Sequence, residues 1–214
     1  MPEMPFEMGN PIWPLLATVK HPSRYTGQEW GTADPGRFAP DRAKVRLCLA
    51  FPDVYEVGMS FLGFQILYAL ANSLEGVAAE RAYCPWIDME ASLRSSNLPL
   101  SSLETGRPLN GFDVVGFTLQ YELTATNILT MLDLGGIPLR SENRREKDPL
   151  VMAGGPGALA PEPLAPFIDF FCLGDGEELL PAVLDVLAET RGKRRQERIA
   201  SLASLPGVYV PGLS

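Results

Sequence analysis

Three glycine-containing segments of the chain hold the side chains that are best placed to contact a ligand. They are residues 52–60, 116–122 and 150–178, and each begins at or near a short apolar run. If those runs are parallel strands of one sheet, their carboxyl ends meet at the same edge, where open α/β sheets bind ligands. Gly154 and Gly155 have no side chain, so a flat or bulky ligand can approach the backbone there. The pattern predicts a ligand-binding edge, and we assign none of its residues a catalytic role.

Each candidate contact also has a structural explanation. Asp53 is explained structurally as the cap of the turn into the first helix, and Tyr55 as an aromatic side chain packed at the edge. Glu56 is most simply a partly solvated loop carboxylate, and Gly58 supplies an unusual backbone angle in either case. The full set of candidate ligand contacts is Asp53, Tyr55, Glu56, Gly58, Met59, Thr118, Gln120, Tyr121, Gly154, Gly155 and Gly174.

Composition and motifs exclude several classes of function. The formal net charge of −8 and an isoelectric point near 4.8 argue against a nucleic-acid-binding protein that neutralises phosphates. A short basic patch at residues 193–195 is expected to be the solvated end of a helix. The sequence has no P-loop lysine, no GxGxxG spacing after a strand and no GxSxG motif. Nucleotide binding of the flavodoxin type and hydrolysis are therefore disfavoured.

The three cysteines, Cys48, Cys84 and Cys172, are widely spaced and form no CxxC pair. Their odd number and apolar neighbours indicate reduced residues of a cytoplasmic protein rather than disulfides. The one histidine, His21, lies in a different region, so we expect no metal site built from this chain alone. No apolar run reaches the ~20 residues that span a bilayer, and no signal peptide is apparent, so we expect no membrane partner.

Apolar runs and helical periodicity alternate after residue 43 and predict one α/β domain over residues 44–214. The expected strands are 45–51, 78–83, 113–119, 150–153 and 168–173, with short extended pieces at 99–103 and 208–210. The expected helices are 60–74, with Ser60 as its N-cap, and 88–96, 124–134, 177–189 and 194–203. Right-handed crossovers then give a doubly wound, mostly parallel sheet of the Rossmann or flavodoxin type.

Residues 1–43 are an N-terminal arm that is rich in proline and glycine and has no sustained helical or strand period. Its aromatic and aliphatic side chains, among them Ile12, Tyr25 and Trp30, make it too apolar for a free tail. Two arrangements remain open: the arm packs on the surface of its own domain, or it docks on a partner domain.

The order of the glycine-containing motifs resembles that of cobalamin-binding domains. Those domains carry D-x-H-x-x-G after the first strand, S-x-L after the third and G-G after the fourth. At the corresponding places this chain has Asp53-x-Tyr55-x-x-Gly58, Thr118-x-Gln120 and Gly154-Gly155. The resemblance implies a fold of the cobalamin-binding type, with cobalamin held at the strand ends by the candidate contacts.

Within that class the chain resembles more specifically the N-terminal cobalamin-binding-like domain of radical S-adenosylmethionine (SAM) proteins, a class of iron–sulfur oxidoreductases. Residues 45–190 carry its typical runs Ala-Gly-Gly-Pro, Pro-Glu-Pro-Leu and Gly174-Asp-Gly-Glu-Glu178. The run Phe-Pro-Asp-Val-Tyr-Glu-Val-Gly-Met-Ser and the earlier Arg24-Tyr25-x-Gly27-x-Glu29 point to a subfamily in which a radical SAM barrel follows. The resemblance implies such a barrel beyond residue 214, with a [4Fe–4S] cluster and SAM.

Three departures from the pattern bear on function. Tyr55 stands where other cobalamin domains have the histidine that ligates cobalt, and a phenol of ordinary pKa ~10 is a poor ligand near neutral pH. Gln120 replaces an apolar residue, and the chain has no CxxxCxxC motif to hold a cluster. Two functions stay open: a cofactor-binding accessory domain of an enzyme for methyl or radical transfer, or a degenerate domain that serves as a scaffold for the barrel or a partner protein.

Overall fold

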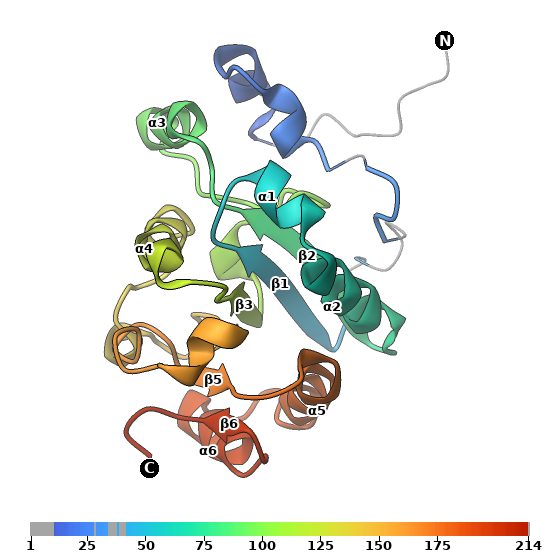
Figure 1. The fold of residues 1–214 in the computed structure, drawn as a ribbon, viewed down its shortest axis with the longest axis vertical. Coiled ribbons are helices and arrows are strands. Elements are labelled where there is room, and N and C mark those ends of the chain that lie inside the picture. Colours follow the sequence, from blue (N-terminus) through green and yellow to red (C-terminus); the bar gives the residue numbers. More distant parts are fainter. Residues whose placement is uncertain (1–10, 28, 34–37, 39–41, 214) are drawn as a thin grey trace.

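The computed structural model of the chain describes residues 11–27, 29–33, 38 and 42–213. Its centre is a six-stranded sheet in the order β2-β1-β3-β4-β5-β6, flanked by helices on both faces (Figure 1). The first five strands are parallel, and only β6 runs antiparallel to its neighbour. The predicted doubly wound α/β class is therefore confirmed.

The strands are mainly apolar, because both faces of a parallel sheet are covered by helices, and β2 departs from this with the buried charged residues Glu80 and Arg81. Every residue of β2 is buried, and only Arg46 of β1 is partly exposed. The strands are β1 (Val45–Phe51), β2 (Val77–Tyr83), β3 (Val114–Thr118), β4 (Leu150–Gly154), β5 (Phe170–Cys172) and β6 (Val208–Tyr209).

The helices divide into two layers. On one face, α2, α5 and α6 cover side chains such as Leu47 and Phe170, and on the other face α3 and α4 cover Cys48 and Val115. The helices are α1 (Tyr55–Ser60), α2 (Leu62–Ser73), α3 (Ile87–Ser96), α4 (Ala125–Leu134), α5 (Gly176–Glu189) and α6 (Arg195–Ala203). Among the described residues, none of these helices is long and apolar enough to cross a membrane.

The prediction of one helix over residues 60–74 with Ser60 as its N-cap is wrong. Ser60 ends α1, and its hydroxyl donates to the carbonyl groups of Glu56 and Val57. Phe61 then has an extended backbone (φ −83°, ψ 105°) and separates α1 from α2. Its ring lies 5.7 Å from that of Phe51, so the break lets an aromatic side chain pack on the end of β1.

The described part of the N-terminal arm packs on its own domain. It forms two short 3₁₀ helices, Trp13–Thr18 and Pro22–Tyr25, each with a proline in its first two positions, where no backbone N–H is needed. Ile12, Leu15 and Val19 are buried in the same core cluster as α3 and α4. Residues 1–10, 28, 34–37 and 39–41 of the predicted arm lie outside the described residues.

Candidate functional site

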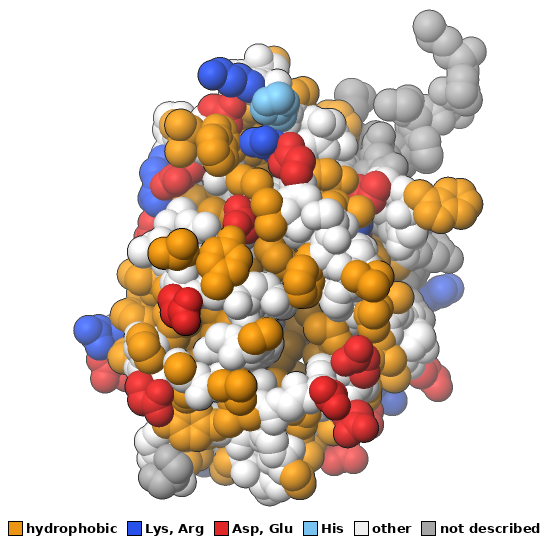
Figure 2. Space-filling model, in the orientation of Figure 1, with side chains coloured by type: hydrophobic (Ala, Val, Ile, Leu, Met, Phe, Trp, Pro, Cys, Tyr) orange, Lys and Arg blue, Asp and Glu red, His pale blue; other side chains and the backbone are white. Residues whose placement is uncertain are grey.

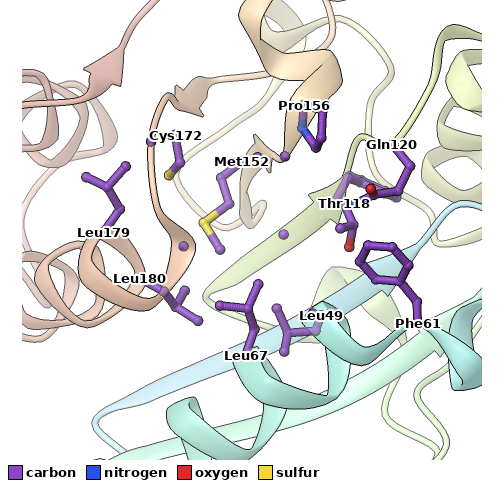
Figure 3. A pocket seen from close by; sticks show the side chains of 17 residues that line it. Leu49, Phe61, Leu67, Thr118, Gln120, Met152, Pro156, Cys172, Leu179 and Leu180 are labelled. Carbon is purple, nitrogen blue, oxygen red and sulfur yellow. The ribbon is translucent and has the colours of Figure 1, made fainter.

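A cavity of about 260 Å³ opens at the carboxyl ends of β1, β3, β4 and β5, between α2 and α5 (Figure 3). We call it the strand-end cavity. Its lining residues are Leu49, Phe61, Gly63, Leu67, Gly116, Phe117, Thr118, Gln120, Met152, Gly154, Gly155, Pro156, Cys172, Gly174, Gly176, Leu179 and Leu180. The cavity therefore lies where the topology of an open parallel sheet places ligands.

The walls of the strand-end cavity are almost entirely apolar. Figure 3 shows Thr118 and Gln120 on one side, near Phe61, with Leu179 and Cys172 on the other. The hydroxyl of Thr118 and the amide of Gln120 are its polar side-chain groups, and none of the described residues that line it carries a carboxylate or an amine. Burial raises the pKa of the Cys172 thiol to about 12, so this side chain is uncharged near neutral pH. Such a cavity suits an uncharged, apolar group with one or two polar atoms.

Two adjacent glycines shape the mouth of the cavity for different reasons. Gly155 has a φ of +103°, and a Cβ there would lie 2.7 Å from the carbonyl oxygen of Leu119, so the backbone itself requires glycine. At Gly154 a Cβ would meet Cys172 at the ordinary contact distance of 3.5 Å. The bare backbone at Gly154 thus leaves room for a Cβ atom.

Five of the predicted contacts lie together at the cavity. Thr118 and Gln120 come from the end of β3, Gly154 and Gly155 from the end of β4, and Gly174 from the loop after β5. The parallel register brings them together, since Thr118 pairs with Gly154 and Gly154 with Cys172.

The predicted contacts on α1 lie elsewhere. The ring of Tyr55 packs edge-on against Tyr83, with ring centres 5.3 Å apart. The unusual backbone angle predicted for Gly58 is wrong, because Gly58 lies within α1 and has no positive φ. A Cβ at Gly58 would overlap the Tyr83 ring, so close packing is what favours glycine there. Glu56 is half-exposed and accepts a hydrogen bond of 2.7 Å from Arg24. None of these α1 side chains lines the cavity, nor does Met59, whose sulfur accepts a hydrogen bond from Gln65. Burial raises the pKa of Tyr55, so its phenol stays protonated.

Asp53 and Tyr121 join two loops above the strand ends. The Tyr121 hydroxyl donates to the Asp53 carboxylate at 2.7 Å, and the other carboxylate oxygen accepts the backbone N–H of Val54 at 2.7 Å. The amide of Asn127 also donates to the Pro52 carbonyl at 2.9 Å. The hydrogen bond to Asp53 raises the pKa of Tyr121. Asp53 does not cap α1, because the N-cap residue of that helix is Val54 and no side chain bonds to the first helical N–H groups. Its carboxylate instead ties the loop after β1 to the loop after β3.

Several lining residues were missed by reasoning from the sequence. Leu67 on α2 and Leu179 and Leu180 on α5 form one wall, and Met152 on β4 covers Gly116. A leucine on the apolar stripe of a helix predicts core packing, and no local signal separates a core position from a cavity wall. The alternation of strands and helices predicts that α2 and α5 cover the sheet, but not that a cavity remains between them.

The Arg24-Tyr25-x-Gly27-x-Glu29 segment holds the arm against β2 and α1. Arg24 pairs with Glu56 on α1, and the hydroxyl of Tyr25 accepts the N–H of Trp86 at 3.2 Å. Glu29 pairs with the buried Arg81 of β2 at 2.9 Å. In this structure the segment therefore acts within the fold and lies away from the strand-end cavity.

Comparison with known proteins gives one family for this chain. Residues 63–211, well over half of the chain, match the family described as radical SAM proteins, N-terminal. The chain belongs to this family of N-terminal domains of radical SAM proteins. No curated protein and no solved structure matched the chain.

Proposed function

We propose that this chain is an accessory domain that holds an apolar part of a cofactor in the strand-end cavity and presents it to a radical SAM barrel. The family match supports the association with radical SAM proteins. The observation that carries the cofactor proposal is the apolar cavity of about 260 Å³ at the strand ends, with bare glycine backbone at its mouth. The protein supplies the site, and the cofactor and barrel supply the chemistry.

Cobalamin is the cofactor that the motif order favours. Its benzimidazole base is a flat, apolar ring, whereas its corrin is much larger. Ligand cavities typically measure ~300–1,000 Å³, so a volume of about 260 Å³ suits the base and not the corrin. Thr118 and Gln120 would offer hydrogen bonds, and Gly154 would allow close approach of the ring. Tyr55 would not ligate cobalt, because its phenol is neutral and packs against Tyr83.

The cluster and SAM belong to the barrel in this proposal. We propose that a barrel on the same polypeptide holds the [4Fe–4S] cluster and SAM, because this chain has no CxxxCxxC motif. Among the described residues, no group of three His, Cys, Asp or Glu side chains could hold a metal ion. The free thiols of Cys48, Cys84 and Cys172 fit a reducing, cytoplasmic location.

Titration of the purified chain with hydroxocobalamin tests the proposal. Binding would be followed by the corrin absorption bands and by quenching of Trp86, which is half-exposed at the strand ends. We expect saturable binding that Gly154→Val weakens roughly tenfold to a hundredfold, because the valine occupies the space meant for the ring. Ala91→Val, at an exposed position on α3, adds the same kind of side chain away from the cavity. It should leave the affinity for hydroxocobalamin unchanged.

A second candidate function is a scaffold that no longer binds cobalamin. The position of Tyr55 favours it, since a ring packed on Tyr83 replaces the histidine of cobalamin domains. Absence of saturable binding by the wild-type chain, both alone and with the barrel attached, would support the scaffold and contradict cofactor binding. Equal weakening by Gly154→Val and Ala91→Val would place any binding outside the cavity.

A further inference from the structure

The segments at the carboxyl ends of the strands carry all the net charge of the chain. We call residues 52–60, 84–90, 119–125, 155–167 and 173–179 the strand-end rim. The rim contains nine acidic and no Lys or Arg residues, a charge of −9, whereas the whole chain has a net charge of −8. The acidic residues are Asp53, Glu56, Asp88, Glu90, Glu122, Glu162, Asp175, Glu177 and Glu178.

Part of this charge is balanced by neighbouring elements. Arg24 of the arm pairs with Glu56, and Arg94 at the far end of α3 pairs with Glu90. The acidic residues in the loops after β3, β4 and β5 have no ion pair among the described residues. The uncompensated charge thus lies around the mouth of the strand-end cavity, where Gly174 and Gly176 flank Asp175.

The strand-end rim is also unusually apolar for a surface. Of twelve large hydrophobic side chains that are exposed among the described residues, seven lie on the rim or directly beside it. Leu123 is 84% exposed and Leu159 is 76% exposed. The seven on or beside the rim are completed by Val57, Leu62, Trp86, Ile87 and Tyr121. Large apolar patches that are bordered by polar residues mark interaction sites.

The two properties occur on one face of the molecule. Figure 2 shows hydrophobic side chains spread across the middle of this face, around a hollow bordered by α2, α5 and β3. Acidic side chains lie on both sides of the hollow, and most basic ones lie near the margins. A partner that covers this face must bury leucine and aromatic side chains and must also carry positive charge, because the net charge of the rim repels an acidic surface.

We infer that the strand-end rim is the docking surface for the radical SAM barrel, and that the opposing face of the barrel is apolar and bordered by Lys and Arg. The inference rests on the proposed association with a barrel. The strand-end rim is the surface, and its negative charge the attraction, that would join this domain to the barrel. Exposed Leu123 and Leu159 supply apolar contacts, and Glu177 and Glu178 at the start of α5 supply charge. Bound in this way, the barrel would close the mouth of the strand-end cavity.

Hydrogen exchange tests the inference on the 214-residue chain and on the polypeptide in which the barrel follows it. We expect the backbone amides of residues 119–125 and 155–167 to exchange about tenfold more slowly when the barrel is present. The protection should decrease between 0.1 and 1 M NaCl, where the screening length falls from about 10 Å to about 3 Å. The double variant Glu177→Lys with Glu178→Lys should reduce protection about tenfold in low salt, and Glu177→Gln with Glu178→Gln should reduce it less.

The matched control places the same charge change at the other end of α5. Asp185→Lys with Glu189→Lys alters two exposed residues of the same helix, and it should leave protection of the rim within about twofold of the wild type. Circular dichroism verifies that both double variants are folded. Protection on another face, equal effects of the two double variants, or no protection would overturn the inference. Cobalamin titration of the 214-residue chain is independent of docking, so the two proposals can fail separately.

Discussion

At the scale of single residues, the structure is organised around a buried cluster of charges on β2. Arg81 is 1% exposed, and its guanidinium donates to Glu104 at 2.6 Å and pairs with Glu29 at 2.9 Å. It also lies over the ring of Tyr68, 4.4 Å from the ring centre. The cluster joins the arm, the edge strand and the loop after α3. Removing one member of a buried pair leaves an uncompensated charge, which costs more than losing a surface pair.

Arg81→Ala should therefore lower the free energy of unfolding by about 3–5 kcal/mol, because Glu104 would be left buried without its partner. Arg94→Ala, which breaks exposed pairs with Glu90 and Asp133, should cost about 0–1 kcal/mol. Urea denaturation of both variants gives the comparison. The double variant Arg81→Met with Glu104→Met should recover only part of the loss, because Glu29 still lacks its partner. Similar costs for the two single variants would show that the cluster is not shielded from water.

The Cys172 thiol gives a prediction for the cavity wall. Burial raises its pKa to about 12, and only the thiolate reacts with alkylating reagents. The thiol is neutral below this pKa, so the rate of alkylation by iodoacetamide should rise about tenfold per pH unit from pH 8 to 10 without a plateau. Peptide mass spectrometry measures the rate at residue 172, with Cys172→Ser as the blank. A plateau near pH 9, as for an exposed cysteine of ordinary pKa, would be inconsistent with burial in the cavity.

At the scale of elements, the N-terminal arm is held by a close approach of backbone to backbone. Gly27 has a φ of +61°, and a Cβ there would lie 2.6 Å from the Leu103 carbonyl oxygen. Gly31, farther along the arm, also has a positive φ, of +91°, but a Cβ there would meet no atom within 4 Å. The two positions share an unfavourable backbone angle for other residues and differ in the space around them.

Alanine substitutions at these two positions distinguish the free-energy cost of backbone strain from the cost of steric overlap. Gly31→Ala should cost about 1–2 kcal/mol from the left-handed conformation alone. Gly27→Ala should cost roughly 1–3 kcal/mol more, because its methyl group overlaps backbone that cannot rotate away. Unfolding in urea, monitored by tryptophan fluorescence, compares them. Equal costs would mean that the arm moves away from Leu103 easily and is only loosely attached.

At the scale of the whole molecule, stability is expected to decrease from the centre of the sheet to its edges. β1 lies between β2 and β3, and β3 lies between β1 and β4, so both are covered on all sides. β6 has two residues and forms one edge next to β5. Backbone amides that open only on global unfolding are those of the most buried strands.

Native-state hydrogen exchange should therefore give β1 and β3 opening free energies near that of global unfolding. The amides of β6 and of the 3₁₀ helix Trp13–Thr18 should open at much lower cost, because each is a short element at the periphery. Exchange measured with increasing urea distinguishes local from global opening. Protection of β6 equal to that of β1 would indicate that the edge strand belongs to the same cooperative unit as the centre.

Much of the fold follows from hydrophobic pattern. The strand predicted at 45–51 is found at Val45–Phe51, and the helix predicted at 177–189 is found at Gly176–Glu189. Continuous apolar runs and acidic residues at helix starts are local signals, so they can be recognised in the sequence without tertiary information. The break at Phe61 is different, because it depends on the contact between the Phe61 and Phe51 rings.

For the candidate site, the sequence by itself determined that Thr118, Gln120, Gly154 and Gly155 stand at strand ends, because parallel strands finish at a common edge. Only the tertiary structure decided that Tyr55 packs on Tyr83 outside the cavity, and that leucines of α2 and α5 form its wall. Periodicity in a sequence encodes which side chains are removed from water. It does not encode which distant side chains meet, since that depends on how complete helices pack across the sheet.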